Sequence, residues 1–238
     1  MMKKLIFIAL LISGVLFPGI LNASSGYSIS LMGVYGWNET WKSHGGVDVI
    51  GYFPINSHFE ATASAECLSA GAFSTTLVAR PKFILPVGEI FLDGSLHYRH
   101  FSRYRTADFD IAASAGYRMD YVSAQFGLIS HTSLDYEYSS EVSSSGSRNV
   151  SEPFNLLYRV AFNVRPASSV WNAGCGVANF TDFEYERTWE PMFFLHGSYN
   201  VSNRLSVLFR GDLKPSGAFH LNAHFWGIAA RAGIKYTF

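Results

Sequence analysis

Charged side chains are scarce in this sequence of 238 residues. Asp, Glu, Lys and Arg make up 15% of the chain, whereas an average soluble domain has roughly 25%. The formal net charge is zero, so the composition does not favour a nucleic-acid partner. With 48% apolar residues, the chain can fill a core or face an apolar medium.

The chain also lacks, beyond its first residues, an apolar run of the ~18 residues that a membrane-spanning helix needs. Residues 5–17 are apolar, follow Lys3 and Lys4, and precede the small residue Ala23. This order is typical of a secretory signal peptide, so we expect residues 1–23 to be cleaved and residues 24–238 to form one domain. An exported apolar chain without a spanning helix is expected to be a soluble all-β protein or a closed barrel in an outer membrane.

What the chain does contain is a period of two, which is clearest in its last residues. Every second residue there is apolar or aromatic: Trp226, Ile228, Ala230, Ala232, Ile234, Tyr236 and Phe238. The residues between them are small, polar or charged, as in a strand with one apolar face. The pattern recurs in about twelve segments, with ten or fourteen as alternatives. The fold class is therefore all-β, and the predicted fold is a closed antiparallel transmembrane β-barrel.

The predicted connections alternate in length. Short turns, for example at residues 54–57 and 86–88, alternate with mostly longer loops at residues 38–46, 132–153, 179–188 and 215–221. In these features the chain resembles the bacterial outer-membrane β-barrel family, whose periplasmic turns are short and whose external loops are longer. The resemblance implies an outer-membrane location, contact with outer-membrane lipids, and reading of Tyr236 and Phe238 by the barrel assembly machinery.

Charges fall almost entirely on the polar face of the predicted strands, where antiparallel folding aligns opposite signs. Arg80 is expected opposite Asp93, Arg99 opposite Asp108, and His97 opposite Asp110. The predicted lumen network consists of Arg80, Asp93, His97, Arg99, Asp108, Asp110, Arg118, Arg159, Arg210, Asp212 and Arg231. Such a network either fills and neutralises the interior or lines a path for a small solute.

Aromatic residues gather near the predicted strand ends, as in the interfacial girdles of membrane barrels. They include Tyr27, Tyr35, Trp37, Tyr52, Tyr117, Tyr121, Trp171, Trp189, Tyr199, Trp226 and Tyr236. The alternative is that they fill the core of a soluble β-sandwich.

Cysteine and metal-binding patterns are sparse. The two cysteines, Cys67 and Cys175, are predicted on opposite sides of the barrel, too far apart for a disulfide. The histidines show no spacing that suggests a metal site, and no cofactor is predicted.

Enzyme motifs are also scarce: the chain has no Gly-x-Ser-x-Gly, no His-Glu-x-x-His and no phosphate-binding loop. Residues 131–133, His-Thr-Ser, are similar to the His-x-Ser motif of outer-membrane lipid A deacylases. The resemblance implies that His131 activates Ser133 at the outer rim, oriented by a carboxylate such as Asp135. The match departs at Leu134, which stands where that family has Asn.

A second resemblance is to omptin-like surface proteases, which use carboxylates and a histidine at the barrel rim. Asp108, Asp110 and His97 would fill those roles, although charge pairing explains the same residues more simply. The leading prediction is therefore a non-enzymatic outer-membrane barrel. It is either a narrow porin-like channel for small solutes or a structural, surface-interacting barrel, with the lipid-modifying hydrolase as the alternative.

Overall fold

The computed structural model describes residues 26–39, 42–102, 106–135, 150–164, 170–185, 190–217 and 224–238. These ranges contain twelve strands. They are β1 Ser28–Asn38, β2 Lys42–Asn56, β3 Phe59–Leu68, β4 Ala72–Ile84, β5 Glu89–Phe101, β6 Thr106–Arg118, β7 Val122–Asp135, β8 Val150–Asn163, β9 Trp171–Ala178, β10 Met192–Asn200, β11 Leu205–Ser216 and β12 His224–Thr237.

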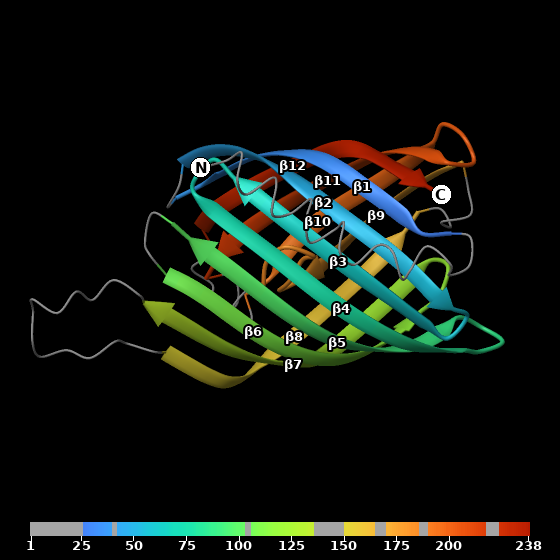
Figure 1. Ribbon diagram of the computed structural model, residues 1–238, viewed down its shortest axis with the longest axis horizontal. Helices are drawn as coiled ribbons and strands as arrows, with labels where there is room; N and C mark the ends of the chain where they lie inside the picture. Colours follow the sequence, from blue (N-terminus) through green and yellow to red (C-terminus); the bar gives the residue numbers. More distant parts are fainter. Residues whose placement is uncertain are drawn as a thin grey trace, which may run out of the picture.

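The strands form a closed barrel in which each pairs antiparallel with its neighbours in sequence (Figure 1). The ring closes where β12 pairs with β1, from Ser28 opposite Thr237 to Asn38 opposite Gly227. Closure removes the free edges that an open sheet would present to lipid. The predicted closed antiparallel barrel of twelve strands is therefore confirmed.

No helix in the described part of the chain is long and apolar enough to cross a membrane.

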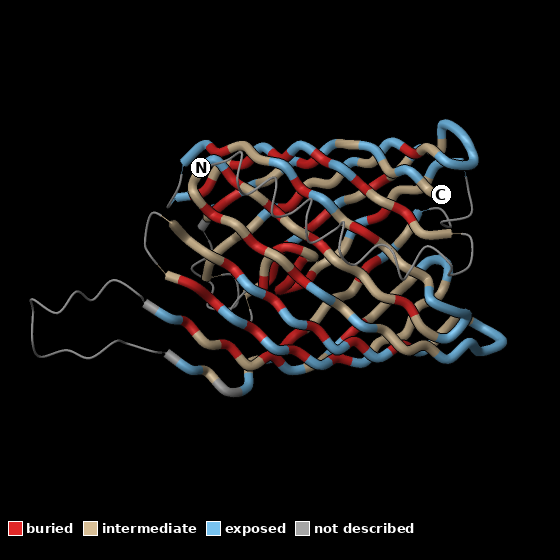
Figure 2. Tube along the Cα trace, in the orientation of Figure 1, coloured by how far each residue is buried: buried red, intermediate tan, exposed pale blue. Residues whose placement is uncertain are grey.

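Exposure alternates along the strands, as the period of two predicted (Figure 2). On β1, for example, Leu31 is 50% exposed while its neighbour Met32 is 6% exposed. The outward positions are apolar on most strands, including Leu77, Leu96, Ile111, Phe126, Leu195 and Ile234. Exposure of such an apolar belt to water is unfavourable, whereas the hydrocarbon of a bilayer covers it. An apolar outer belt on a closed barrel is therefore typical of a membrane protein.

Two strands extend further than the sequence suggested. Residues 42–46 pair with β1, with His44 opposite Gly36, so the predicted loop at residues 38–46 is wrong. Likewise β7 continues to Asp135, beyond the predicted start of the longest loop at residue 132. Both differences have the same physical reason. Polar side chains such as His44 and Ser133 suggested loops, but in a barrel strand they point into the polar lumen.

The two ends of the barrel differ in their connections. At one end, called here the turn end, residues 57–58, 85–88, 119–121 and 201–204 join strands, and the chain terminates there at Phe238. The opposite end, the loop end, carries the connections between β7 and β8 and between β9 and β10. Residues 136–149 of the longest predicted loop lie outside the described residues.

The last residue packs on Tyr27, which directly precedes β1. Phe238 donates its backbone N–H to the Tyr27 carbonyl at 3.0 Å and stacks on the Tyr27 ring at 4.5 Å. Tyr236 meets Phe238 edge-on at 4.9 Å. These aromatic rings lie where β12 closes onto β1, and their reading by the assembly machinery stays a prediction.

Two of the predicted girdle aromatics lie inside the barrel instead. Tyr52 donates its hydroxyl to Glu60 in the lumen at 2.7 Å. Trp226 lies at an irregularity where β11 and β12 shift register, and it lines an internal pocket beside Lys214. A β-bulge re-aims side chains in this way, which a strict period of two does not anticipate. Trp189 lies outside the described residues.

Candidate functional site in the lumen

A segment between β9 and β10 folds into the barrel. Residues 179–185, called here the inner loop, follow the end of β9 and are almost wholly buried, with Asn179 at 0%, Thr181 at 3% and Phe183 at 2% exposure. Figure 2 shows this buried segment inside the ring of strands. The sequence predicted residues 179–188 as an external loop, which is wrong for residues 179–185. Residues 186–189 are outside the described ranges.

Asn179 makes the inward turn possible. Its side-chain oxygen accepts from the backbone N–H of Tyr158 at 2.8 Å, and its amide donates to the Leu156 carbonyl at 2.6 Å. An unpaired backbone N–H or carbonyl group at membrane depth is unfavourable. The Asn179 side chain pairs two such groups of β8 where the neighbouring strand β9 has ended. The residues after Asn179 can therefore turn from the sheet into the lumen.

Thr181 shapes the tip of the inner loop. Its hydroxyl accepts from the backbone N–H groups of Phe183 at 3.1 Å and Glu184 at 3.0 Å. Its own N–H donates to the Glu184 carbonyl at 2.7 Å. A threonine hydroxyl that satisfies nearby N–H groups is a common way to hold a compact turn.

The inner loop packs against one wall through apolar contacts. Phe180 and Tyr185 form a buried cluster with Ala112, Ile129 and Leu157, from β6, β7 and β8. The Tyr185 hydroxyl contacts the Ser95 hydroxyl on β5 at 2.9 Å, and burial raises the pKa of Tyr185 above its ordinary value. This wall of the lumen is therefore apolar where the loop rests on it.

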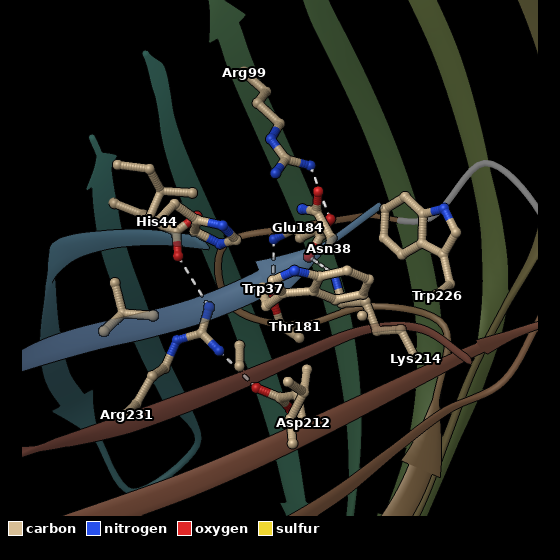
Figure 3. Close-up of a pocket in the computed structure, with 16 residues that line it drawn as sticks. Trp37, Asn38, His44, Arg99, Thr181, Glu184, Asp212, Lys214, Trp226 and Arg231 are labelled. Carbon is tan, nitrogen blue, oxygen red and sulfur yellow. Dashed lines mark hydrogen bonds and ion pairs between the residues drawn. The ribbon is translucent and has the colours of Figure 1, made fainter. Parts of the chain in front are cut away.

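Polar contacts tie the loop to other parts of the ring. Ser64, on β3, donates to the carbonyl of Asp182, and β3 lies across the ring from β9. Glu184 binds Arg99 of β5 at 3.0 Å and also pairs with Lys214 of β11 (Figure 3). Burial alone would raise the pKa of Glu184, but Lys214 and Arg99 hold it well below its ordinary value of 4.5. The inner loop is thus tied to several strands around the lumen.

A small pocket of about 30 Å³ lies beside the inner loop (Figure 3). Thr181 and Glu184 of the loop line it, together with residues of β1, β2, β3, β5, β11 and β12. Its lining mixes charge with aromatic surface: Lys214 lies 5.9 Å from the Trp226 ring. The pocket is therefore bordered by charged and aromatic side chains.

The expected pair of Arg80 and Asp93 meets at the turn end of the lumen. The Arg80 guanidinium donates twice to Asp93, at 2.6 and 2.7 Å, and once to Glu60 at 3.1 Å. Lys82 also donates to Glu60, at 2.8 Å. Arg118 is partly exposed and pairs with Glu89 on the neighbouring strand β5.

A second cluster centres on Arg231, which joins three buried carboxylates. It donates to Asp48 on β2 at 2.7 Å, to Glu66 on β3 at 2.9 Å and to Asp212 on β11 at 2.6 Å. Arg210 lies opposite Arg231 in the ladder, and its Nε also donates to Asp212, at 2.8 Å. The sequence analysis missed Asp48 and Glu66, although both lie on the polar face of their strands.

A third cluster gathers the histidines and acids of β5, β6 and β7. The ladders place His97 opposite Asp110 and Arg99 opposite Asp108, as expected. The His97 Nε2 atom is 4.0 Å from Asp110, and its Nδ1 atom is 2.8 Å from the Thr76 hydroxyl. Every member of this cluster is buried, so it does not form the open rim site of a surface protease.

His131 and Ser133 belong to this third cluster rather than to a rim loop. The Ser133 hydroxyl donates to Asp108 at 2.7 Å, and the Nδ1 atom of His131 contacts Asp110. Both residues lie near the outer end of β7, where the sequence placed them, but they are buried inside the lumen and not open at the rim. A nucleophilic serine needs its proton directed at the base, whereas here the hydroxyl is directed at a carboxylate. This geometry gives the hydrolase interpretation no support.

The fourth cluster surrounds Phe194 of β10. The guanidinium carbons of Arg159 on β8 and Arg210 on β11 lie 5.1 and 5.0 Å from its ring centre. His196, two residues along β10, has its ring 5.9 Å from Phe194 and lies opposite Arg210 in the ladder. The structure therefore brings together two of the predicted lumen arginines and a histidine that the sequence did not single out.

Both cysteines are unbonded, Cys67 on β3 and Cys175 on β9, and these strands lie diametrically opposite in the ring. Among the described residues, no three His, Cys, Asp or Glu side chains are grouped so that they could hold a metal ion.

Comparison with known proteins gives structural matches only. No family model and no curated protein sequence matches the chain. Among solved structures, the chain is similar to the KdgM porin in complex with disordered oligogalacturonate, with a TM-score of 0.53, 12% identity, and coverage of 89% of this chain and 99% of that one.

A second similar structure is the translocator domain of the autotransporter NalP from Neisseria meningitidis, with a TM-score of 0.51, 13% identity, and coverage of 95% of each chain. At these identities the likeness concerns the fold. Together with the closed ring and its apolar outer belt, it shows that this chain has the fold of a bacterial outer-membrane β-barrel.

Proposed function

We propose that the protein is a narrow, non-enzymatic outer-membrane channel for small solutes, constricted by its inner loop. The observation that carries the proposal is the lumen itself. Buried positions inside the ring hold Asp48, Glu66, Asp93, Asp110, Asp212 and Arg231, among other polar residues. Polar side chains of this kind line the interior of membrane barrels that hold water and pass polar solutes.

The inner loop gives the proposed channel its narrowest point. Ion pairs and hydrogen bonds, rather than a continuous apolar core, hold the loop to β3, β5 and β11. One of the similar solved proteins, KdgM, is named a porin, which adds to the proposal through the shared fold. The outer-membrane location and insertion by the assembly machinery are part of the same proposal.

The direct test is conductance of the refolded full chain in a planar lipid bilayer. The proposed function predicts discrete current steps of small, uniform size. Absence of steps, both in the wild type and in a variant without the inner loop, would contradict the channel and favour a structural, surface-interacting barrel. Lipid A deacylation that disappears in Ser133→Ala and His131→Ala would instead establish the hydrolase.

The contact of Glu184 with Arg99 and Lys214 predicts how the channel responds to pH. The folded pKa of Glu184 lies below its ordinary value of 4.5. The ionised carboxylate therefore holds the inner loop to Arg99 and Lys214 fully above pH 4.5, and this stabilisation is lost as the pH falls toward the lower, folded pKa. Conductance is therefore expected to stay constant from neutral pH down to about pH 5 and to rise only under stronger acid.

The Glu184→Gln variant tests the same contact by imitating the protonated acid. It is expected to show increased conductance at neutral pH and a weaker acid response, measured by single-channel recording across a pH series. Glu39, an exposed residue in the connection after β1, provides a matched control as Glu39→Gln. An acid response that is unchanged in Glu184→Gln would assign it to another lumen carboxylate.

A further inference from the structure

The cluster around Phe194 contains an arginine without a counter-charge. Among the described residues, Arg159 makes no hydrogen bond or ion pair, and its contact is with the Phe194 ring at 5.1 Å. The charged groups that act on it at longer range are Arg210, Asp182, Arg80 and Asp212. Two of these four are themselves cations, so the surroundings do not neutralise Arg159.

Its neighbour Arg210 is only partly satisfied. The Arg210 Nε atom donates to Asp212 at 2.8 Å, while its Nη2 atom is buried without a hydrogen-bond partner. Asp212 is shared, because Arg231 also donates to it at 2.6 Å. One carboxylate therefore serves two arginines, and a guanidinium N–H group beside Arg159 remains free.

A second arginine pair in the same barrel shows what a neutralised arrangement looks like. On the β4–β6 side, Arg80 and Arg118 lie 4.5 and 5.8 Å from the Phe91 ring. There Arg80 pairs with Asp93 and Glu60, and Arg118 pairs with Glu89. In each cluster two arginines lie over a phenylalanine ring. The Phe91 cluster has three carboxylates for its two arginines, whereas among the described residues the Phe194 cluster has only Asp212, which Arg231 also uses.

The free donors at Phe194 suit one class of ligand. A guanidinium presents N–H groups in a planar fork that matches the oxygens of a carboxylate or phosphate. A partly buried cation without a partner is unfavourable, and an entering oxyanion would remove that cost. His196 adjoins the same face of β10 and can donate a further hydrogen bond.

We propose that Arg159, Arg210 and His196 form a binding site for a small oxyanion, a carboxylate or phosphate group, inside the lumen. The site rests on the proposed channel function, which supplies the anion through the lumen. It deepens that function by naming anionic solutes as the preferred class.

Isothermal titration calorimetry of the refolded full chain in detergent tests the site directly. Inorganic phosphate and glucuronate serve as the two oxyanion probes, and glucose is the uncharged match for glucuronate. We expect saturable binding of at least one oxyanion and none of glucose. Binding of phosphate alone, of glucuronate alone or of both identifies which oxyanion the site accepts.

Three variants locate the binding. Arg159→Gln is expected to weaken it about tenfold or more, the loss typical of a charge-assisted hydrogen bond. Arg159→Lys keeps the charge without the planar fork and is expected to bind with intermediate affinity. Arg204→Gln removes an arginine from the exposed turn between β10 and β11 and is expected to bind like the wild type. Because Arg159 has no ion-pair partner in the described structure, its removal leaves no buried carboxylate unpaired.

Bilayer recordings separate failure of the site from failure of the channel. Under a salt gradient, the reversal potential of Arg159→Gln is expected to shift toward cation preference relative to wild type and Arg204→Gln. A conducting protein in which Arg159→Gln changes neither affinity nor reversal potential would overturn the oxyanion site alone. Oxyanion binding that depends on Arg159 in a protein that never conducts would overturn the channel and leave the site in place.

Discussion

Replacing residues 180–184 with a short Gly-Ser linker is expected to raise the single-channel conductance several-fold. The replaced residues include Phe180, which packs on the apolar wall, and Glu184, which holds Arg99 and Lys214. Without these contacts, and without that of Asp182 with Ser64, the segment is no longer tied across the lumen to β3 and β11, and ion flux rises as the narrowest cross-section widens. The measurement is single-channel recording in a planar bilayer.

The fold should survive this change, because the β9–β10 ladder, from Met192 opposite Ala178 to Tyr199 opposite Trp171, lies outside the replaced residues. Circular dichroism of the variant is expected to match the wild type. A control with a linker of the same composition in the exposed turn at residues 201–204 is expected to conduct like the wild type. If the inner-loop variant kept the wild-type conductance, the inner loop would not be the constriction.

Arg231→Met is expected to cause the largest loss of stability of any single substitution considered for this barrel. The change leaves Asp48, Glu66 and Asp212 close together and buried, at 0%, 4% and 1% exposure, without their shared cation. Removing one partner of a buried ion pair typically costs about 3–5 kcal/mol, because the remaining charge stays desolvated. We expect a decrease of that size in the free energy of unfolding, measured by urea titration in lipid vesicles.

Two further variants test whether the loss comes from unpaired buried charge. Arg204→Met removes an exposed arginine from a turn and is expected to change stability by less than about 0.5 kcal/mol. Arg231→Met combined with Asp48→Asn and Glu66→Gln is expected to regain part of the loss, because Asp212 keeps its contact with Arg210 and fewer buried charges remain unpaired. An Arg231→Met barrel that unfolds at the wild-type urea concentration would show that water, not Arg231, solvates these carboxylates.

The ladder contacts could be predicted because sequence spacing sets them directly. A short turn between β4 and β5 determines which residues face each other, so Arg80 and Asp93 follow from counting along the chain. Contacts across the lumen do not follow from counting. Arg231 reaches Asp48 and Glu66 from strands that are distant in sequence, and curvature of the closed ring brings them together.

The sequence of the inner loop contains one indication of its inward course. Residues 179–185 contain Phe180, Phe183 and Tyr185, which are unusual in a loop expected to lie in water. These rings are buried against the lumen wall. The longest loop was predicted to begin at residue 132, inside β7, for the opposite reason, since polar residues facing a lumen resemble polar residues in a loop.

The sequence by itself determined that this chain is a closed twelve-stranded barrel with an apolar exterior. It could do so because the alternation of apolar and polar residues is a local property of each strand, set by lipid on the outside and a polar lumen on the inside. Only the tertiary structure decided what occupies the lumen. The inward course of residues 179–185 and the unpaired state of Arg159 depend on which side chains meet across the ring, and closure of the barrel sets those distances.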